Sequence, residues 1–301
     1  MKQLSPPILW ESAKAIKQKN LKEHRRRAYL AGGRVPWSNG YYDYRWQEIQ
    51  AAISDAAVLD AFRTQRMPKG FGIGIDERIA EYPWILSRLA QTDGTLLDAG
   101  STFNFKEILD HAAVAKKELT ICTYHPESPN FNERRISYLY ADLRRLPLRD
   151  DWFDVVVSQS TIEHIDMDNS IYGYDLPNAA MTQKKSYDYL KAIDELVRIL
   201  KPGGTLLLTF PTGKFINYGF FQHIDAEMIE RLNERLSPRG KVAEEYLLYT
   251  SEGWTFATSE ACTEIESYNP HTGMGKGTDG AAHCRAICCI QFRKYELEKK
   301  N

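Results

Sequence analysis

Hydrophobic residues along this chain gather in short runs, and polar or glycine-containing segments separate one run from the next. Apolar runs of about 4–8 residues are typical of strands that are buried in a parallel sheet. The run at 153–158 is nearly continuous in valine, as expected for a strand that is covered on both faces. We therefore expect about seven strands, at 95–97, 117–124, 138–141, 153–158, 205–210, 241–249 and 285–292.

Longer segments around these runs repeat their hydrophobic residues at helical spacing. Residues 186–200 and 225–236 each place an apolar stripe on one side of a helix. Residues 10–30 and 47–62 are also predicted to be helical, and the first of these carries many Lys and Arg residues. We interpret that basic face as solvated, with an anchor for an anionic partner as the alternative.

The alternation of strands and helices predicts an α/β fold class. We expect a doubly wound, mostly parallel sheet whose last strand is antiparallel, together with an N-terminal helical extension. The chain has 301 residues, of which 43% are hydrophobic, so it can bury a sizeable core. We place the extension at 1–90, covering the site, and the main domain at 91–295.

A glycine turn joins the first predicted strand to the next helix. The strand at 95–97 ends at Asp98. Gly100 and Ser101 then allow a tight turn, and Asn104 can cap the helix that follows. In a doubly wound sheet, ligands bind beyond the carboxyl ends of the strands, where a helix start offers unpaired N–H groups. We therefore expect a nucleotide-type ligand beside Asp98.

Three further segments follow this turn in a fixed order, at 140–148, 152–165 and 196–213. Together with the turn they resemble the class I S-adenosylmethionine-dependent methyltransferases, of the Rossmann-like, methyltransferase type 11-like kind. The resemblance covers roughly 95–213, and the ordered segments are more specific than a single glycine turn. It implies S-adenosyl-L-methionine as the cofactor and methyl transfer as the activity.

The resemblance also implies which residues contact the cofactor. Asp98 and Gly100 match the family's cofactor motif, with Ser101 standing where a further glycine is common. Asp142, at the end of the third strand, or the amide of Leu143 would meet the adenine edge. The alternative for Asp142 is a helix cap or a turn residue.

The end of the second strand departs from the family pattern, which usually places an acidic residue there to bind the ribose. Thr123 and Tyr124 stand at this position, and Glu127 follows a little later. Either a hydroxyl group or Glu127 holds the ribose, or the adenosine site is altered.

Two residues complete the predicted cofactor site. Arg78 precedes the first core strand and either binds the methionine carboxylate, which suits its planar fork, or forms a surface ion pair. Ser158 ends the fourth strand at the same edge of the sheet.

The candidate catalytic residues are His164, Glu163 and His223, in that order. The alternative for His164 is a helix-positioning role, and for His223 we favour packing or capping over general-base catalysis. His164, Asp166 and Asp168 could bind a divalent metal, but nothing in the sequence fixes their geometry. We predict no metal site.

The acceptor class comes from a second resemblance. Segments 74–78, 81–84 and 160–169 look like those of methyltransferases that accompany bacterial surface-glycan assembly. They imply a small-molecule or glycan-related acceptor and O- or N-methyl transfer. The long polar connection at 166–183 is predicted to be a lid that faces this substrate.

Charge and cysteine content narrow the partners and the compartment. The formal net charge of −1 makes nucleic acid an unlikely partner. Five cysteines are an odd number for a disulfide framework, and their spacing suits no zinc module. Cys284, Cys288 and Cys289 lie in or near a predicted buried strand, where free cysteines act as small apolar residues, so we expect a reducing, cytoplasmic location. No run is apolar for long enough to span a bilayer.

Three rival functions remain open at this point. A dehydrogenase would use a similar sheet, but the turn after Asp98 lacks the Gly-x-Gly-x-x-Gly pattern. A non-catalytic, methyltransferase-like binding module is favoured by the altered second strand. A nucleic-acid methyltransferase is favoured by the basic first helix alone.

Overall fold

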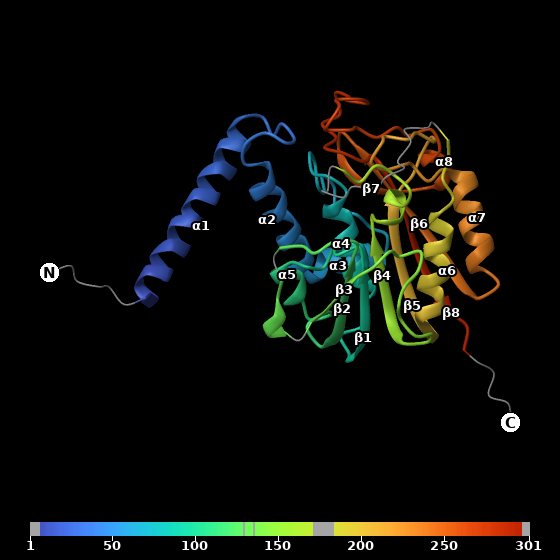
Figure 1. The fold of residues 1–301 in the computed structure, drawn as a ribbon. Helices are drawn as coiled ribbons and strands as arrows, with labels where there is room; N and C mark the ends of the chain where they lie inside the picture. Colours follow the sequence, from blue (N-terminus) through green and yellow to red (C-terminus); the bar gives the residue numbers. More distant parts are fainter. Residues whose placement is uncertain (1–6, 129, 135, 171–183, 297–301) are drawn as a thin grey trace.

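The computed structural model of this protein describes residues 7–128, 130–134, 136–170 and 184–296. Within these residues, eight strands form one sheet in the order β3-β2-β1-β4-β5-β8-β6-β7, and helices cover both of its faces (Figure 1). The strands are β1 (Gly94–Ala99), β2 (Lys117–Thr123), β3 (Ser137–Tyr140), β4 (Phe153–Gln159), β5 (Leu200–Pro211), β6 (Gly240–Thr250), β7 (Gly253–Ala257) and β8 (Ala286–Lys294). The predicted α/β fold class, doubly wound and mostly parallel, is confirmed.

The direction of the strands changes on one side of the sheet only. Strands β1 to β5 pair in parallel, whereas β8 lies between β5 and β6 and runs antiparallel to both. The prediction of an antiparallel last strand is therefore confirmed. The sequence did not predict β7, which pairs with β6 through a hairpin whose last paired residues are Thr250 and Gly253. Gly253 has φ of 96°, a conformation that suits a glycine in a tight turn.

Most helices follow the predicted segments, but those at 78–88 and 259–262 were not predicted, and two predicted features differ. The helices are α1 (Pro7–Ala31), α2 (Tyr41–Ser54), α3 (Ala56–Arg63), α4 (Arg78–Arg88), α5 (Lys106–Leu109), α6 (Tyr189–Ile199), α7 (Ala226–Leu236) and α8 (Ser259–Cys262), with the 3-10 turns η1 (Asn132–Arg134) and η2 (Ile162–His164). The segment predicted as one helix at 47–62 is divided at Asp55, whose side chain caps α3. The predicted cap at Asn104 is wrong, because α5 starts after Phe105 and the Asn104 side chain accepts a hydrogen bond from Tyr138 instead.

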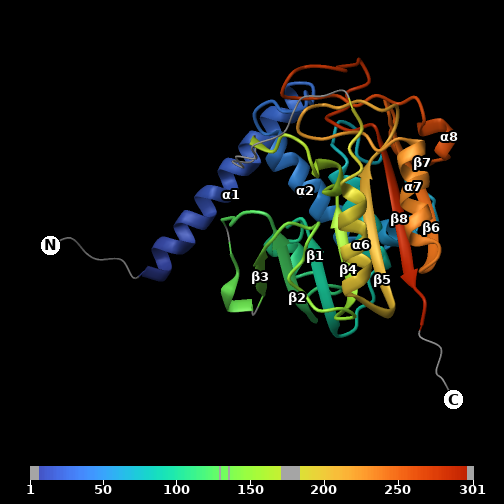
Figure 2. The same cartoon turned by 45° about the vertical axis from the view of Figure 1, so that its right-hand side comes forward.

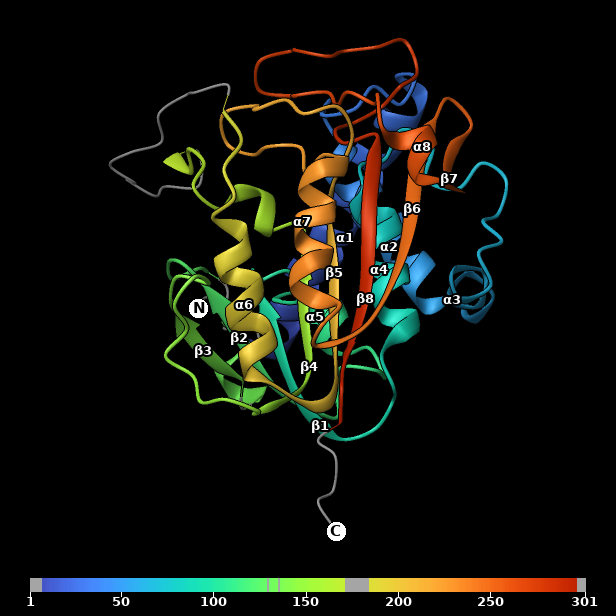
Figure 3. The ribbon, with the colours of Figure 1, turned by 90° about the vertical axis from the view of Figure 1, so that its right-hand side faces the viewer.

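Alternate residues of the central strands face two separate cores. Leu96 and Leu207 pack with α2, α3 and α4 on one face of the sheet. Leu97 and Leu206 pack with α6 and α7 on the other face. Figure 3 shows α6 and α7 in front of β4, β5 and β8, with α2 and α4 behind them. A nearly continuous apolar run thus fills both cores, because successive side chains of a strand point to opposite faces.

The N-terminal segment both joins the main core and extends from it. Helix α1 projects away from the sheet, and its C-terminal end packs on α2 (Figure 2), where Tyr29 contacts the rings of Tyr41 and Tyr44. Helices α2 to α4 share their core with the sheet, so the predicted units 1–90 and 91–295 are packed together through one set of buried residues. None of the helices in the described residues is both long and apolar enough to cross a membrane.

The strand order reverses between β1 and β4. From β1 the chain proceeds outward through β2 and β3, and it then returns to place β4 on the other side of β1. The loops after β1 and β4 therefore leave the sheet in opposite directions and open a crevice at their carboxyl ends. This is the edge at which the sequence places its candidate residues.

Candidate functional site

A pocket of about 240 Å³ lies at this reversal. Its lining comes from the segments that follow all four strands β1, β2, β3 and β4, and from the start of α4. Seven of the residues predicted from the sequence line it: Arg78, Gly100, Thr123, Tyr124, Asp142, Leu143 and His164. The other five predicted residues, Asp98, Ser101, Ser158, Glu163 and His223, are not part of its lining.

Asp98 organises the turn after β1 from inside the protein. Its carboxylate accepts hydrogen bonds from the backbone N–H and the hydroxyl of Thr102, at 3.2 and 3.1 Å, and from the N–H of Phe103 at 2.7 Å. Burial raises the pKa of Asp98 to about 7, and these donors oppose the rise. Asp98 is therefore a positioning residue for a turn whose surface is formed by Gly100 and Thr102.

Gly100 is required by the tightness of this turn. Its φ is 132°, and a Cβ atom built on it would lie 2.0 Å from the Thr161 hydroxyl oxygen. A side chain here would both strain the backbone and fill the space between the ends of β1 and β4. The glycine predicted from the cofactor motif thus keeps one wall of the pocket open.

Glu127 supplies the acidic group that the end of β2 lacks. Its Oε2 atom accepts a hydrogen bond of 2.6 Å from the Ser101 hydroxyl, and its Oε1 atom accepts one of 3.5 Å from the Thr123 hydroxyl. Glu127 and Thr123 both line the pocket, and Ser101 lies behind them with a positive φ of 60°. The loop after β2 therefore places the Glu127 carboxylate beside the Thr123 hydroxyl group, at the end of the strand where the sequence itself has no acidic residue.

Asp142 lies at the end of β3 and is held by its own loop. Arg144 donates to both of its carboxylate oxygens and also to Asp188, which precedes α6. Partial burial opposes ionisation of Asp142, but the hydrogen bonds from Arg144 outweigh it and lower the pKa. An ionised carboxylate thus lies beside Leu143, and both residues line the pocket.

Arg78 begins α4 and reaches the pocket from the opposite side. Its Nη1 atom donates to Glu81 at 3.0 Å and to the carbonyl oxygen of Gln159 at 3.3 Å. Glu81 is fully buried, and its other oxygen accepts hydrogen bonds from the hydroxyl groups of Ser160 and Thr209. The Arg78–Glu81 pair is therefore a buried anchor that ties α4 to β4 and β5, in place of the surface ion pair that the sequence allowed.

The hydroxyl groups that reach the pocket from the end of β4 are not that of Ser158, which the sequence predicted. Ser158 is buried within the strand, and its hydroxyl has no hydrogen-bond partner among the described residues. Ser160 and Thr161 follow it and line the pocket instead. Ser160 has a positive φ of 39°, and such strained backbone is concentrated at functional sites.

His164 ends η2 and is kept neutral by its surroundings. Its Nδ1 atom lies 2.6 Å from the carbonyl oxygen of Phe220, and because a carbonyl can only accept, Nδ1 carries the proton and Nε2 keeps a lone pair. Burial lowers the pKa of His164 to about 4. Glu163 is buried beside it, with Oε1 3.7 Å from Nε2, and burial raises the pKa of Glu163 well above its ordinary value.

The structure does not bring His223 to the pocket. Its ring is fully buried, with Nδ1 3.0 Å from the carbonyl oxygen of Lys214 and Nε2 2.7 Å from the hydroxyl oxygen of Ser267. Both ring nitrogens are therefore used by the protein itself. This geometry agrees with the packing role that we favoured for His223.

The predicted lid lies only partly within the described residues, because 171–183 fall outside them. Asp166 and Asn169, which precede this stretch, line the pocket. Asp168 instead accepts a hydrogen bond from the N–H of Ser170 at 2.9 Å. Within the described residues, His164, Asp166 and Asp168 do not converge into a metal-binding group.

Several pocket residues were not selected from the sequence. Thr102, Ser160 and Thr161 carry hydroxyl groups that turn residues commonly have, and only the course of the backbone shows that they line a pocket. These residues could have been predicted from the sequence by their position, because each lies within a few residues after the end of a strand. Arg144 also lines the pocket, where ion pairs with Asp142 and Asp188 hold its side chain.

Comparison with known families matches part of the chain. Residues 112–208 match a family model described as "Methyltransferase domain". The match runs from before β2 into β5, and it includes the loops that carry Glu127, Asp142 and His164. It leaves out Arg78 and the Gly100 turn. This part of the chain therefore has the sequence character of a methyltransferase domain. A comparison with curated proteins finds no significant match.

Solved structures provide distant similarities. The YcgJ protein from Bacillus subtilis is 12% identical, covers 72% of this chain and 99% of its own, and has a TM-score of 0.43. An S-adenosylmethionine-dependent methyltransferase from Methanosarcina mazei is 15% identical, covers 71% and 98%, and has a TM-score of 0.43. The N-methyltransferase NodS from Bradyrhizobium japonicum, solved with S-adenosyl-L-homocysteine, is 14% identical, covers 84% and 99%, and has a TM-score of 0.39. Because none of these TM-scores reaches 0.5, the fold assignment rests on the strand order itself.

Proposed function

We propose that this protein is an S-adenosylmethionine-dependent methyltransferase that transfers a methyl group to the oxygen or nitrogen of a small-molecule or glycan-related acceptor. The observation that carries the proposal is the pocket at the reversal of strand order, lined by the ends of β1, β2, β3 and β4. The match of 112–208 to a methyltransferase domain supports the same assignment.

The residues of the pocket fit the parts of this cofactor. The ribose hydroxyl groups are donors, and the Glu127 carboxylate can accept from them. Asp142 and the Leu143 amide offer an acceptor and a donor for the adenine edge. The Arg78 guanidinium can bind the methionine carboxylate with donors that Glu81 does not use. Gly100 leaves space for close approach of the cofactor to the backbone.

When bound, the cofactor supplies a methyl group that is activated by a positively charged sulfur. The protein then has to align the acceptor behind that methyl group and exclude water. Neutral His164 lines the pocket, and its Nε2 lone pair can take the proton from a hydroxyl acceptor. The low pKa of His164, about 4, makes it a weak base, so positioning rather than proton abstraction would supply most of the rate.

The acceptor class rests on the resemblance of 74–78, 81–84 and 160–169 to glycan-associated methyltransferases. In the structure these segments lie together, since Glu81 accepts hydrogen bonds from Arg78, Gln159 and Ser160. Of these segments, Arg78 and several residues of 160–169 line the pocket, and buried Glu81 connects them from behind its wall. A sugar offers hydroxyl groups to such a polar wall.

Cofactor binding can be tested by calorimetric titration of the full chain with S-adenosylmethionine and S-adenosylhomocysteine. We expect one site, with competition between the two ligands. No heat and no thermal shift with millimolar ligand would contradict the proposal. Saturable binding without turnover of sugar, sugar-nucleotide and amine acceptors would favour the binding-module alternative, and salt-sensitive RNA or DNA binding would favour a nucleic-acid methyltransferase.

The role of His164 can be tested separately with His164→Gln. We expect kcat to fall by about 10-fold or more for a hydroxyl acceptor, with unchanged affinity for S-adenosylhomocysteine. The matched control is His24→Gln, since His24 is exposed on α1. An unchanged kcat in His164→Gln would leave only the helix-positioning role.

A further inference from the structure

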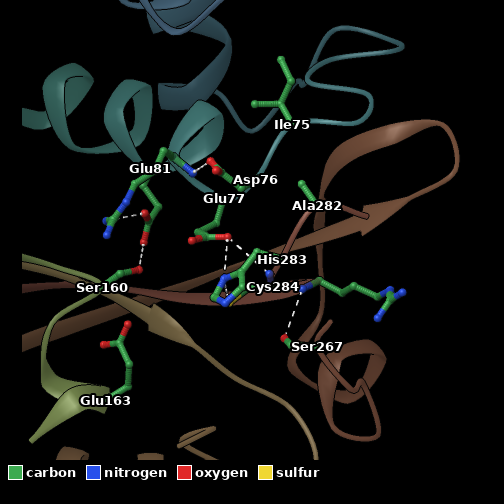
Figure 4. Close-up of polar contacts among 12 residues, drawn as sticks. Ile75, Asp76, Glu77, Glu81, Ser160, Glu163, Ser267, Ala282, His283 and Cys284 are labelled. Carbon is green, nitrogen blue, oxygen red and sulfur yellow. Dashed lines mark hydrogen bonds and ion pairs between the residues drawn. The ribbon is translucent and has the colours of Figure 1, made fainter. Parts of the chain in front are cut away.

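A second polar cluster lies beside the pocket, where α4 begins and the segment before β8 ends. Glu77 precedes α4, and His283 and Cys284 precede β8. Figure 4 shows that the three side chains point toward one another from these two segments. One ligand atom of each, a Glu77 carboxylate oxygen, a His283 ring nitrogen and the Cys284 sulfur, lies within 4.8 Å of the other two.

The separations of these atoms are close to those in a tetrahedral metal site. His283 Nδ1 lies 3.4 Å from Glu77 Oε2 and 3.0 Å from Cys284 Sγ. Ligands bound at about 2.0–2.3 Å to a tetrahedral zinc ion are separated by about 3.3–3.6 Å. A small adjustment of side chains therefore suffices for all three atoms to reach one ion.

A proton relay is a poorer explanation of the same contacts. In a Cys–His–carboxylate triad, the thiol and the carboxylate contact different nitrogens of the imidazole ring. Here both Glu77 Oε2 and Cys284 Sγ approach the same atom, Nδ1 of His283. The three atoms surround one point instead of forming a chain.

An independent observation comes from Glu163. Its side chain is almost fully buried, and its Oε2 atom has no hydrogen-bond partner among the described residues. Its carboxyl group extends from η2 into the space between Ser160 and the cluster of Glu77 and His283 (Figure 4). A buried carboxylate oxygen without a partner requires a cation or a donor nearby.

The surroundings of the cluster hold its members in place. Ser267 contacts Cys284, accepts from the N–H of Arg285 at 3.4 Å, and lies 2.7 Å from His223 Nε2. The ring of Phe221 packs against His283, with centroids 5.2 Å apart. Contacts of this kind, made by residues that touch the ligands and not the ion, orient the ligands of metal sites. They also give buried His223 a role outside the pocket.

We propose that Glu77 Oε2, His283 Nδ1 and Cys284 Sγ bind one Zn²⁺ ion, with the fourth position open toward Glu163. Mixed carboxylate, imidazole and thiolate ligands favour zinc over magnesium or calcium. Three protein ligands with one open position are typical of zinc that holds a water molecule or a substrate group. Glu163 would accept a hydrogen bond from whatever fills that position. The proposal rests on no part of the proposed methyl transfer.

The test is metal binding by the full chain after treatment with chelator. We expect one Zn²⁺ per chain, and one Co²⁺ per chain with the intense near-ultraviolet absorption of a thiolate bound to cobalt. Cys284→Ser should abolish this absorption and weaken Zn²⁺ binding by more than about 100-fold. The matched control is Cys262→Ser, because Cys262 is equally buried but lies in α8, outside the cluster.

The outcomes separate the alternatives even if one variant does not fold. Zn²⁺ should raise the Tm of the wild type and of Cys262→Ser, but not of His283→Gln or Glu77→Gln. Failure of the folded wild type to bind Zn²⁺ stoichiometrically would overturn the proposal. A cobalt spectrum without thiolate absorption, or unchanged affinity in His283→Gln, would also overturn it.

Discussion

The Ser101 hydroxyl donates a 2.6 Å hydrogen bond to the carboxylate of Glu127 and thereby joins the turn after β1 to the loop after β2. The two residues are 26 positions apart in the sequence. Their contact places a carboxylate at the end of β2, where the chain itself has Thr123. Because the ribose hydroxyl groups of the proposed cofactor need an acceptor, Glu127 is the first residue to change.

Glu127→Ala should weaken the binding of S-adenosylhomocysteine. Hydrogen bonds to a charged group contribute about 1.5–3 kcal/mol, so we expect Kd to rise by about 10- to 100-fold. Calorimetry measures this directly. Glu133→Ala is the matched control, since Glu133 is exposed on η1 and lies outside the pocket lining. Equal affinity in the two variants would mean that a hydroxyl group holds the ribose or that the adenosine site is altered.

Arg78→Met should reduce both stability and cofactor binding. Removing one partner of a buried pair leaves the other charge uncompensated, and we expect a loss of about 3 kcal/mol in the free energy of unfolding. The double variant Arg78→Met with Glu81→Gln removes both charges and should recover most of this stability. It should not recover affinity for the cofactor. Recovery of both quantities would show that Arg78 acts only through Glu81.

Gly100→Ala tests whether the open wall of the pocket is needed. The new Cβ atom would lie 2.0 Å from Thr161 Oγ1 at a φ of 132°, so we expect a loss of about 3 kcal/mol or more and no detectable cofactor binding. Gly273→Ala is the control, because Gly273 has a φ of 80° and no atom within 4 Å of a built Cβ. It should lose only about 1–2 kcal/mol and keep its affinity. Chemical denaturation and calorimetry distinguish these outcomes.

Stability should fall on acidification because of buried His223. Burial lowers its pKa in the folded state to about 4, whereas the unfolded chain takes up the proton near pH 6.5. The unfolded state therefore binds more protons between these values, and stability is lost as pH falls through this window. We expect His223 to account for about 2 kcal/mol between pH 7 and pH 5.

The quantity to measure for His223 is the change in the free energy of unfolding with pH, rather than its value at one pH. Urea denaturation of the wild type and of His223→Gln should show a smaller dependence on pH in the variant. His24→Gln, at an exposed position, should leave the slope unchanged. Equal slopes in the wild type and His223→Gln would contradict the assignment.

The periodicity of the chain was enough to predict the sheet and most of its helices. The run at 153–158 holds three successive valines and is short, which favours a strand with both faces covered, and the glycine turn indicated where β1 ends. The helices α4 and α8 were not predicted. The strand β7 and the division of the helix at 47–62 were also missed. Both depend on a local turn or cap, at Gly253 and Asp55, that a hydrophobic pattern does not report.

The sequence by itself determined the fold class, the edge of the sheet that carries the site, and residues such as Gly100 and Asp142 that follow strand ends. Only the tertiary structure decided what each side chain does there. It turned Asp98 inward to hold its turn, brought Glu127 back to β2, and placed Glu77 against His283 and Cys284. The physical reason is that strand ends follow from local periodicity, whereas hydrogen-bond partners distant in sequence are set by how loops pack.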